Sequence, residues 1–332
     1  MLKKIPLLFL LFLFSCDDKK EITTQPEPAQ DSWGISLPSS IQPEVFAAND
    51  VDQSTVDLTL KWYKIAADAW GNYGPLEVWI VGKNAQAAID LDKRWCDRRL
   101  KTDAKWNTQW DCANGDPYVS GSGWSPFYRY VTEGGAAVST YRRDYIDYHF
   151  LTIIMSAKYP GPEEEDYLPV TLHEYFHVYQ HSHILDIEKN GDKSIRGSKN
   201  GGEGKPWFAE GGAEYMAQLL YSIQPEVKDG YLKEIMQRKH SSVAKYKTFG
   251  KKLNELSYSD PVGSSEIGAW FIAYLVHSHG EEVFRLNFYK DLNSLGFESS
   301  FLKHFGKSSK DYLVEFDRFL DKSLEEALKI IP

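Results

Sequence analysis

Apolar side chains in the first half of the chain follow two different spacings. Some segments place an apolar residue at every third or fourth position, which buries one face of a helix. Others are short apolar runs that end near glycine, proline or asparagine, as buried strands do. The pattern predicts helices over 52–70 and 85–100 and strands over 76–81, 136–141 and 148–157.

The second half of the chain keeps the helical spacing almost throughout, from Pro225 to Pro332. Further upstream, the acidic stretch 163–166 suits the beginning of a helix, because the helix dipole stabilises carboxylates there. Residues 190–205 are rich in glycine and charge, which predicts a flexible connector or part of a cleft rim. This order of elements predicts an α+β fold.

The sequence His173-Glu174-Tyr175-Phe176-His177 lies in the helix that follows the acidic stretch. Residues four apart share one helix face, so the two imidazoles can point at a single metal ion. Zinc binds neutral imidazole nitrogens, and Glu174 can reach a water molecule held by that metal. A carboxylate beside such a water is the arrangement that hydrolyses peptide bonds with metal assistance.

A second motif supplies another ligand. Residues 206–215 read Pro-Trp-Phe-Ala-Glu-Gly-Gly-Ala-Glu-Tyr and continue into a helical pattern. A catalytic zinc site needs three protein ligands, and Glu210 completes the set. Glu214, one turn further, can accept a hydrogen bond from a ligand imidazole. Two glycines after Glu210 would weaken a helix by about 1 kcal/mol each, which predicts that the metal-bearing helix approaches closely there.

The two motifs together resemble those of the gluzincin metallopeptidases, the group that contains thermolysin-like and aminopeptidase-like enzymes. The resemblance implies one Zn²⁺ per chain, held by His173, His177 and Glu210. It also implies that Glu174 is the general base of a hydrolase.

The same resemblance implies a catalytic unit over residues 51–332. Its upper lobe of mixed sheet and helices would cover about 51–189, and a mostly helical lower lobe about 190–332. The strand around 135–138 would be the sheet edge that pairs with an extended peptide substrate.

One position departs from the pattern of aminopeptidase-like relatives. They carry a tyrosine that stabilises the oxyanion shortly before the glycine equivalent to Gly268, where this chain reads Ser264-Ser265-Glu266-Ile267. Loss of one such donor typically costs about 10²–10³ in rate. The candidates to replace it are Tyr258 and three histidines, His240, His277 and His279.

A different third ligand is also conceivable. His183 lies six residues after His177, the interval at which metzincin peptidases place a histidine beyond a glycine turn. Gln180 occupies the turn position, and glycine is what permits a sharp exit from a helix. We expect the helix to continue and to carry His183 away from the metal. His181 is two turns from the first ligand, about 11 Å, so His181 and His183 are expected to form a polar helix end.

The first 15 residues contain two lysines and then an apolar run from Ile5 to Phe14. This pattern is typical of a secretory signal peptide and is short for a membrane span. Leu13-Phe14-Ser15-Cys16 resembles a bacterial lipobox, which implies a lipid on Cys16 and anchoring in the cell envelope, at the periplasmic face or the cell surface. The Gln-, Pro- and Ser-rich composition that follows predicts a flexible tether over about 16–50.

Cys96 and Cys112 are the other two cysteines, and an exported protein can join them in a disulfide. The segment 101–130 between two predicted elements is rich in aromatic residues. It predicts either a substrate platform or a small core fixed by that disulfide, and we favour the core. The net charge of −9 offers no basic patch for nucleic acid.

The sequence favours a membrane-anchored zinc peptidase acting on a peptide or protein. The alternative is a catalytically weak or inactive binding module of the cell envelope that keeps the zinc fold. Glu174 favours the enzyme, because a structural zinc site needs no base, whereas the missing tyrosine favours the module. Residues 134–138 lack a carboxylate for a substrate's amino terminus, although Glu133 is adjacent, which favours endopeptidase or carboxyl-side activity.

Overall fold

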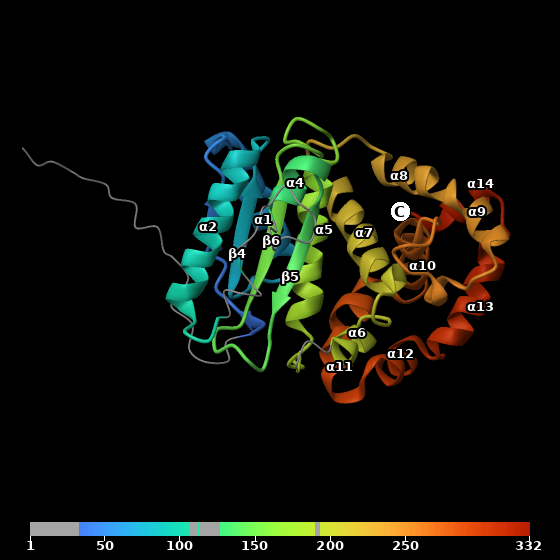
Figure 1. The fold of residues 1–332 in the computed structure, drawn as a ribbon. Helices are drawn as coiled ribbons and strands as arrows, with labels where there is room; N and C mark the ends of the chain where they lie inside the picture. Colours follow the sequence, from blue (N-terminus) through green and yellow to red (C-terminus); the bar gives the residue numbers. More distant parts are fainter. Residues whose placement is uncertain (1–32, 107–111, 113–126, 190–192) are drawn as a thin grey trace, which may run out of the picture.

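A computed structural model of the chain describes residues 33–106, 112, 127–189 and 193–332. The fold is α+β as predicted, with a mixed sheet and helices in the first half and a largely helical second half (Figure 1). The elements are, in chain order, β1 (Ile35–Ser36), β2 (Glu44–Ala47), α1 (Gln53–Trp70), β3 (Tyr73–Gly74), β4 (Leu76–Val81), α2 (Ala85–Thr102), α4 (Tyr128–Glu133), β5 (Ala136–Tyr141), β6 (Phe150–Ser156), α5 (Tyr167–Ser182), α6 (Ser194–Lys199), α7 (Pro206–Ser222), α8 (Tyr231–His240), α9 (Ser242–Phe249), the 3₁₀ turn η1 (Leu253–Glu255), α10 (Ser264–His279), the π-helix η2 (Val283–Phe288), α11 (Tyr289–Leu295), α12 (Phe297–Phe305), α13 (Ser309–Phe319), α14 (Leu324–Ala327) and the 3₁₀ turn η3 (Leu328–Ile330).

A four-stranded sheet in the order β2-β4-β6-β5 organises the first half. β2, β4 and β6 are parallel, and β5 runs antiparallel to β6 at one edge. Parallel strands are covered on both faces and therefore read as nearly continuous apolar runs. Every residue of β4 and β6 is buried, which is why those two runs show no alternation.

Helices cover both faces of this sheet (Figure 1). On one face, Val78 and Ile153 belong to a core that also contains the buried sides of α1 and α5. On the other face, Trp79 packs with residues of α2 and α4. The first core continues without interruption into α7, α10 and the C-terminal helices. Because each large buried apolar side chain contributes about 1.5–3 kcal/mol, α5 is held firmly between the sheet and the helical half.

The aromatic segment 101–130 contributes to the second core. A disulfide joins Cys96 and Cys112 with an S–S distance of 2.01 Å. Trp106 and Phe127 pack in the same cluster. The described part of the segment therefore forms a small core, whereas residues 107–111 and 113–126 lie outside the described residues.

Two expected boundaries differ from the structure. The sequence predicts a tether as far as residue 50, but Trp33 is buried in the first core, β1 pairs with β3, and β2 joins the sheet. These strands are short and lie among proline and serine, so the composition of the whole segment hides them. The prediction of a flexible connector over 190–205 is also wrong in part, because this segment contains α6.

The predicted signal peptide and the lipidation site at Cys16 lie among residues 1–32, outside the described residues. Within the part of the chain that the structure describes, no helix is both long and apolar enough to cross a bilayer.

Close packing between α7 and α10 depends on two glycines. A Cβ atom at Gly211 of α7 would overlap the backbone of Gly268 in α10. The expectation of a close backbone is therefore right, but that backbone belongs to α10 and not to the metal-bearing helix α5. Gly212 faces side chains of α5, with the amide of Gln180 nearest.

We predict that Gly211→Ala lowers the free energy of unfolding. Overpacking costs about 1–3 kcal/mol, which exceeds the roughly 1 kcal/mol that alanine gains in helix propensity. Urea denaturation followed by circular dichroism measures the difference. An equal or greater unfolding midpoint for the variant would contradict the close packing of α7 on α10.

Candidate metal centre

Helices α5 and α7 pack against one another and bring the two sequence motifs together. His173 and His177 project from α5, and Glu210 projects from α7, whose first residue is Pro206. Proline suits this position because the first N–H of a helix has no partner within the helix. The three side chains form a group that can hold a metal ion.

Three atoms of this group lie at the corners of a nearly equilateral triangle. Nε2 of His173 and Nε2 of His177 are 3.1 Å apart. Each lies 3.3 Å from Oε2 of Glu210. Tetrahedral zinc with bonds of 2.0–2.1 Å separates neighbouring ligand atoms by about 3.3 Å. The spacing of the three atoms therefore fits one face of a zinc coordination tetrahedron.

The opposite nitrogens of both imidazoles are hydrogen bonded, which fixes the tautomers. Nδ1 of His173 lies 3.0 Å from Oε2 of Glu214, and an ionised carboxylate only accepts. Nδ1 of His177 lies 2.8 Å from Oε1 of Gln180, whose amide is oriented by donating to the carbonyl of Ala209 at 2.9 Å. Both Nε2 atoms are therefore unprotonated in the neutral rings, and three acceptors face one point without a donor.

The electrostatic surroundings favour positive charge at this point. Burial opposes ionisation of Glu214, but the hydrogen bond with His173 and the ammonium of Lys239, 2.6 Å away, hold the pKa of Glu214 well below its usual range. Burial likewise opposes protonation of His173, yet Glu210 and Glu214 raise the pKa of His173 well above its ordinary value. A divalent cation can supply the positive charge that these carboxylates favour, in place of a proton on His173.

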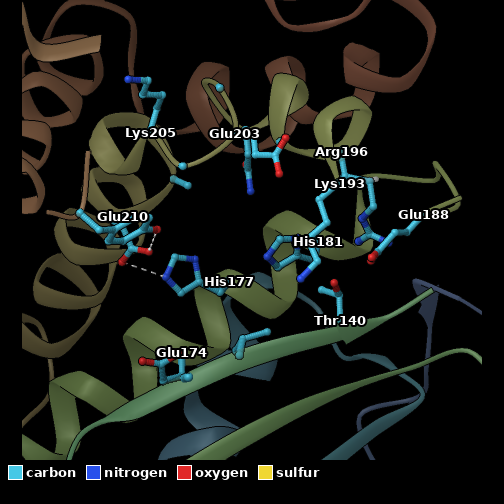
Figure 2. Close-up of a pocket in the computed structure, with 18 of the residues that line it drawn as sticks. Thr140, Glu174, His177, His181, Glu188, Lys193, Arg196, Glu203, Lys205 and Glu210 are labelled. Atoms are coloured by element: carbon cyan, nitrogen blue, oxygen red, sulfur yellow. Dashed lines mark hydrogen bonds and ion pairs between the residues drawn. The ribbon is translucent and has the colours of Figure 1, made fainter. Parts of the chain in front are cut away.

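Glu174 lies beside this group on α5, with its carboxylate toward the side on which Glu210 lies (Figure 2). It is 6 % exposed, and its Oε2 atom has no hydrogen-bond partner in the described part of the chain. Burial raises the pKa of Glu174. An unpartnered carboxylate with a raised pKa is suited to accept a proton from water.

Tyr258 reaches the centre from the loop before α10. Its hydroxyl donates to Oε1 of Glu210 at 2.6 Å. Burial of the hydroxyl and the Glu210 charge raise the pKa of Tyr258, so the group stays protonated and able to donate. Tyr258 lines the same cleft, of about 700 Å³, as Glu174 and His177. The other oxyanion candidates, His240, His277 and His279, do not line this cleft.

His183 does not join the metal group. It follows the last residue of α5, its Nδ1 lies 2.7 Å from the carbonyl oxygen of Tyr179, and its ring packs against Tyr73 and Tyr289. The expectation that His183 lies away from the metal is therefore confirmed. His181 lies in the last turn of α5, at the helix end as predicted. It also lines the cleft, and its Nδ1 is buried.

Two supporting residues escaped the sequence analysis. Gln180 is three positions after His177, and helical spacing places it on the same face. In the sequence, Gln180 stands out only because it occupies the position where a sharp exit from the helix would need glycine. Lys239 comes from α8, and nothing in the local pattern marks it as the partner of Glu214. Only the packing of α8 on α7 brings it there.

Comparison of the chain with family models, with curated proteins and with solved structures finds no match. Its own geometry therefore defines it as an α+β protein with a His/His/Glu group that can hold a metal ion.

We predict that His177→Ala abolishes metal retention, because two ligands cannot replace three in a site of this geometry. Elemental analysis of the purified protein after dialysis measures zinc per chain. His183→Ala is the matched control and should retain zinc. Full zinc occupancy in His177→Ala, or its loss in His183→Ala alone, would contradict the assignment.

Proposed function

We propose that this protein is a zinc-dependent peptidase of the gluzincin type. The observation that carries the proposal is the convergence of Nε2 of His173, Nε2 of His177 and a carboxylate oxygen of Glu210 next to the unpartnered carboxylate of Glu174. A purely structural zinc site closes its fourth position with a protein ligand and has no use for a base. Here the fourth side faces a cleft that Glu174 and Tyr258 also line.

Zinc, when bound, polarises the scissile carbonyl and lowers the pKa of a coordinated water. Glu174 takes the proton of the attacking water and delivers it to the leaving amine, so that the amine departs neutral. Tyr258 turns its hydroxyl from Glu210 to the oxygen that gains negative charge. Glu214 and Gln180 keep the two ligand imidazoles in the tautomer and orientation that binding requires.

The edge of the sheet supports a peptide as the substrate. Among the residues that the structure describes, β5 pairs with β6 on one side and is the last strand of the sheet. Ala136, Ala137 and Val138 of β5 line the cleft and are partly exposed. The unpaired N–H and C=O groups of such an edge can bind an extended peptide as an added strand.

One observation favours the second candidate, a binding module that keeps the site without efficient turnover. The hydroxyl of Tyr258 is bonded to a ligand carboxylate, and the residue is 67 % exposed. An oxyanion donor stabilises a transition state best when it is oriented in advance. Catalysis by this chain requires the hydroxyl of Tyr258 to leave Glu210 and to donate to the substrate oxygen.

We also infer that the protein is attached to a membrane of the cell envelope through a lipid on Cys16. The lipobox-like sequence supports this inference. Trp33, the first residue that the structure describes, is buried in the first core.

Cys16→Ser is predicted to move the protein from the membrane fraction to the soluble fraction, because the lipid is the proposed anchor. Immunoblots of fractionated cells measure the distribution. Wild-type protein is the reference. Unchanged membrane association of the variant would show that another part of the chain binds the envelope.

Glu174→Gln should retain zinc but lose at least about 10² in kcat, because the amide cannot take the proton of water. Glu165→Gln, an exposed acidic residue outside the cleft, serves as the control and should be fully active. Zinc content and hydrolysis of a quenched fluorescent peptide library are measured together. Equal activity of Glu174→Gln and wild type would refute the proposed base.

Tyr258→Phe is predicted to reduce kcat by about 10–10² while zinc content stays constant, because one oxyanion donor is removed. Tyr145→Phe, which removes a hydroxyl outside the cleft, should have little effect. Unchanged kcat in Tyr258→Phe would assign oxyanion stabilisation to another group. A loss of zinc would instead give Tyr258 a role in holding Glu210.

A further inference from the structure

The cleft extends past the metal centre to a basic end. The ring centroids of His177 and His181 are 6.4 Å apart, so His181 marks one helical turn beyond the ligands. Lys193 and Arg196 line the cleft beside His181. Figure 2 shows these cationic residues grouped at the end of the cleft opposite Glu210.

Arg196 is buried with part of its hydrogen-bonding capacity unused. It is 6 % exposed and stacks on the ring of Trp33 at 4.8 Å. Its Nη1 makes one long hydrogen bond, 3.4 Å, to the carbonyl of Asp186, and its Nη2 has no partner in the described part of the chain. Burial lowers the pKa of Arg196 to about 10, so the guanidinium stays charged at neutral pH. Because Nη2 is itself enclosed, Arg196 acts on this end of the cleft mainly as a fixed positive charge that few protein acceptors offset.

This end of the cleft is positively charged. Lys193 is exposed and makes no ion pair with any described residue. Glu188, 4 % exposed, also lines this end, but its Oε2 lies 4.0 Å from Nε of Arg143 and so faces another cation. The charges of Lys193 and Arg196 therefore favour an anionic group, such as a carboxylate, in the cleft. Glu203 and Lys205 on the rim offset each other.

We propose that Lys193 and Arg196 form a subsite for a substrate carboxylate, so that the cleft selects peptides with an acidic residue near the scissile bond. This inference rests on the proposed peptidase function. Charge-assisted bonds from a guanidinium and an ammonium are stronger than neutral ones, and they also repel a free amino terminus.

The direction of β5 decides on which side of the scissile bond the acidic residue lies. β5 runs from Ala136 to Tyr141, and Thr140, close to its carboxyl end, lies at the basic end of the cleft (Figure 2). Antiparallel pairing is slightly the more stable arrangement, and it presents the amino-terminal side of the peptide there. One helical turn is about 5.4 Å and an extended residue about 3.3 Å. One turn thus equals about 1.6 extended residues, and because the subsite lies beside His181, one turn past His177, we expect the acidic residue at least two positions before the scissile bond.

Peptide pairs that differ only by Glu or Gln test the subsite. Each peptide is acetylated and amidated, and the position of the Glu/Gln pair is moved along one sequence. Binding to zinc-loaded Glu174→Gln protein is measured by fluorescence anisotropy, and cleavage by wild type is located by mass spectrometry. Glu two or more positions before the cleaved bond should bind at least about tenfold more tightly than Gln.

A third set of Gln peptides with a free carboxyl terminus distinguishes the source of the carboxylate. Equal binding of the free and amidated forms supports the side-chain assignment and the antiparallel direction. Tighter binding of the free form alone supports the subsite but overturns that direction, because the peptide then lies parallel to β5. Equal binding of all three sets overturns the subsite.

Reversal of the charge at Lys193, compared with the same change outside the cleft, tests the subsite from the side of the protein. Lys193→Glu should remove the preference for Glu over Gln peptides while the zinc content stays unchanged. Lys189→Glu makes the same charge change at an exposed residue that does not line the cleft, and should keep the preference. Lys193 is the decisive position, because Arg196 also packs on Trp33 and its replacement can unfold the region.

The outcomes separate the subsite from the peptidase itself. Cleavage of Gln and Glu peptides at equal rates, or equal effects of Lys193→Glu and Lys189→Glu, overturns the subsite and leaves the peptidase intact. Failure to bind or cleave any peptide, with zinc bound, overturns both.

Discussion

The rest of this structure holds three ligand atoms in place so that their lone pairs face one point. Nε2 of His173, Nε2 of His177 and Oε2 of Glu210 lie within 3.3 Å of one another, and acceptors at such distances repel without a cation between them. Hydrogen bonds from the far side of both rings prevent the imidazoles from turning away. Metal affinity is therefore built from the orientation of the ligands as much as from their identity.

The helices that carry His173, His177 and Glu210 are held in place by packing against their neighbours. α5 is packed between the sheet and α7, and α7 is in turn fixed on α10 by the contact of Gly211 with Gly268. Lys239 from α8 neutralises Glu214, so a carboxylate can remain ionised in a buried position. Residues of the sheet edge, of the metal group and of the basic end line one cleft.

The parts of this arrangement that depend on local spacing were accessible from the sequence. Two histidines four apart share a helix face whatever surrounds them, and the downstream Glu210 motif follows the same helical logic. Contacts between distant segments were not accessible. β2 is only four residues long, Lys239 approaches from another helix, and the neighbour of Gly211 is α10 rather than α5. Such partners are set by tertiary packing, which periodicity does not encode.

X-ray absorption at the zinc edge of the purified protein tests the central claim most directly, because it reports the ligands of the metal itself. We expect nitrogen and oxygen neighbours at about 2.0–2.1 Å, with the outer-shell signal of two imidazoles and no sulfur. Sulfur neighbours near 2.3 Å, a coordination shell without imidazole, or a protein that retains no zinc after dialysis would contradict the claim.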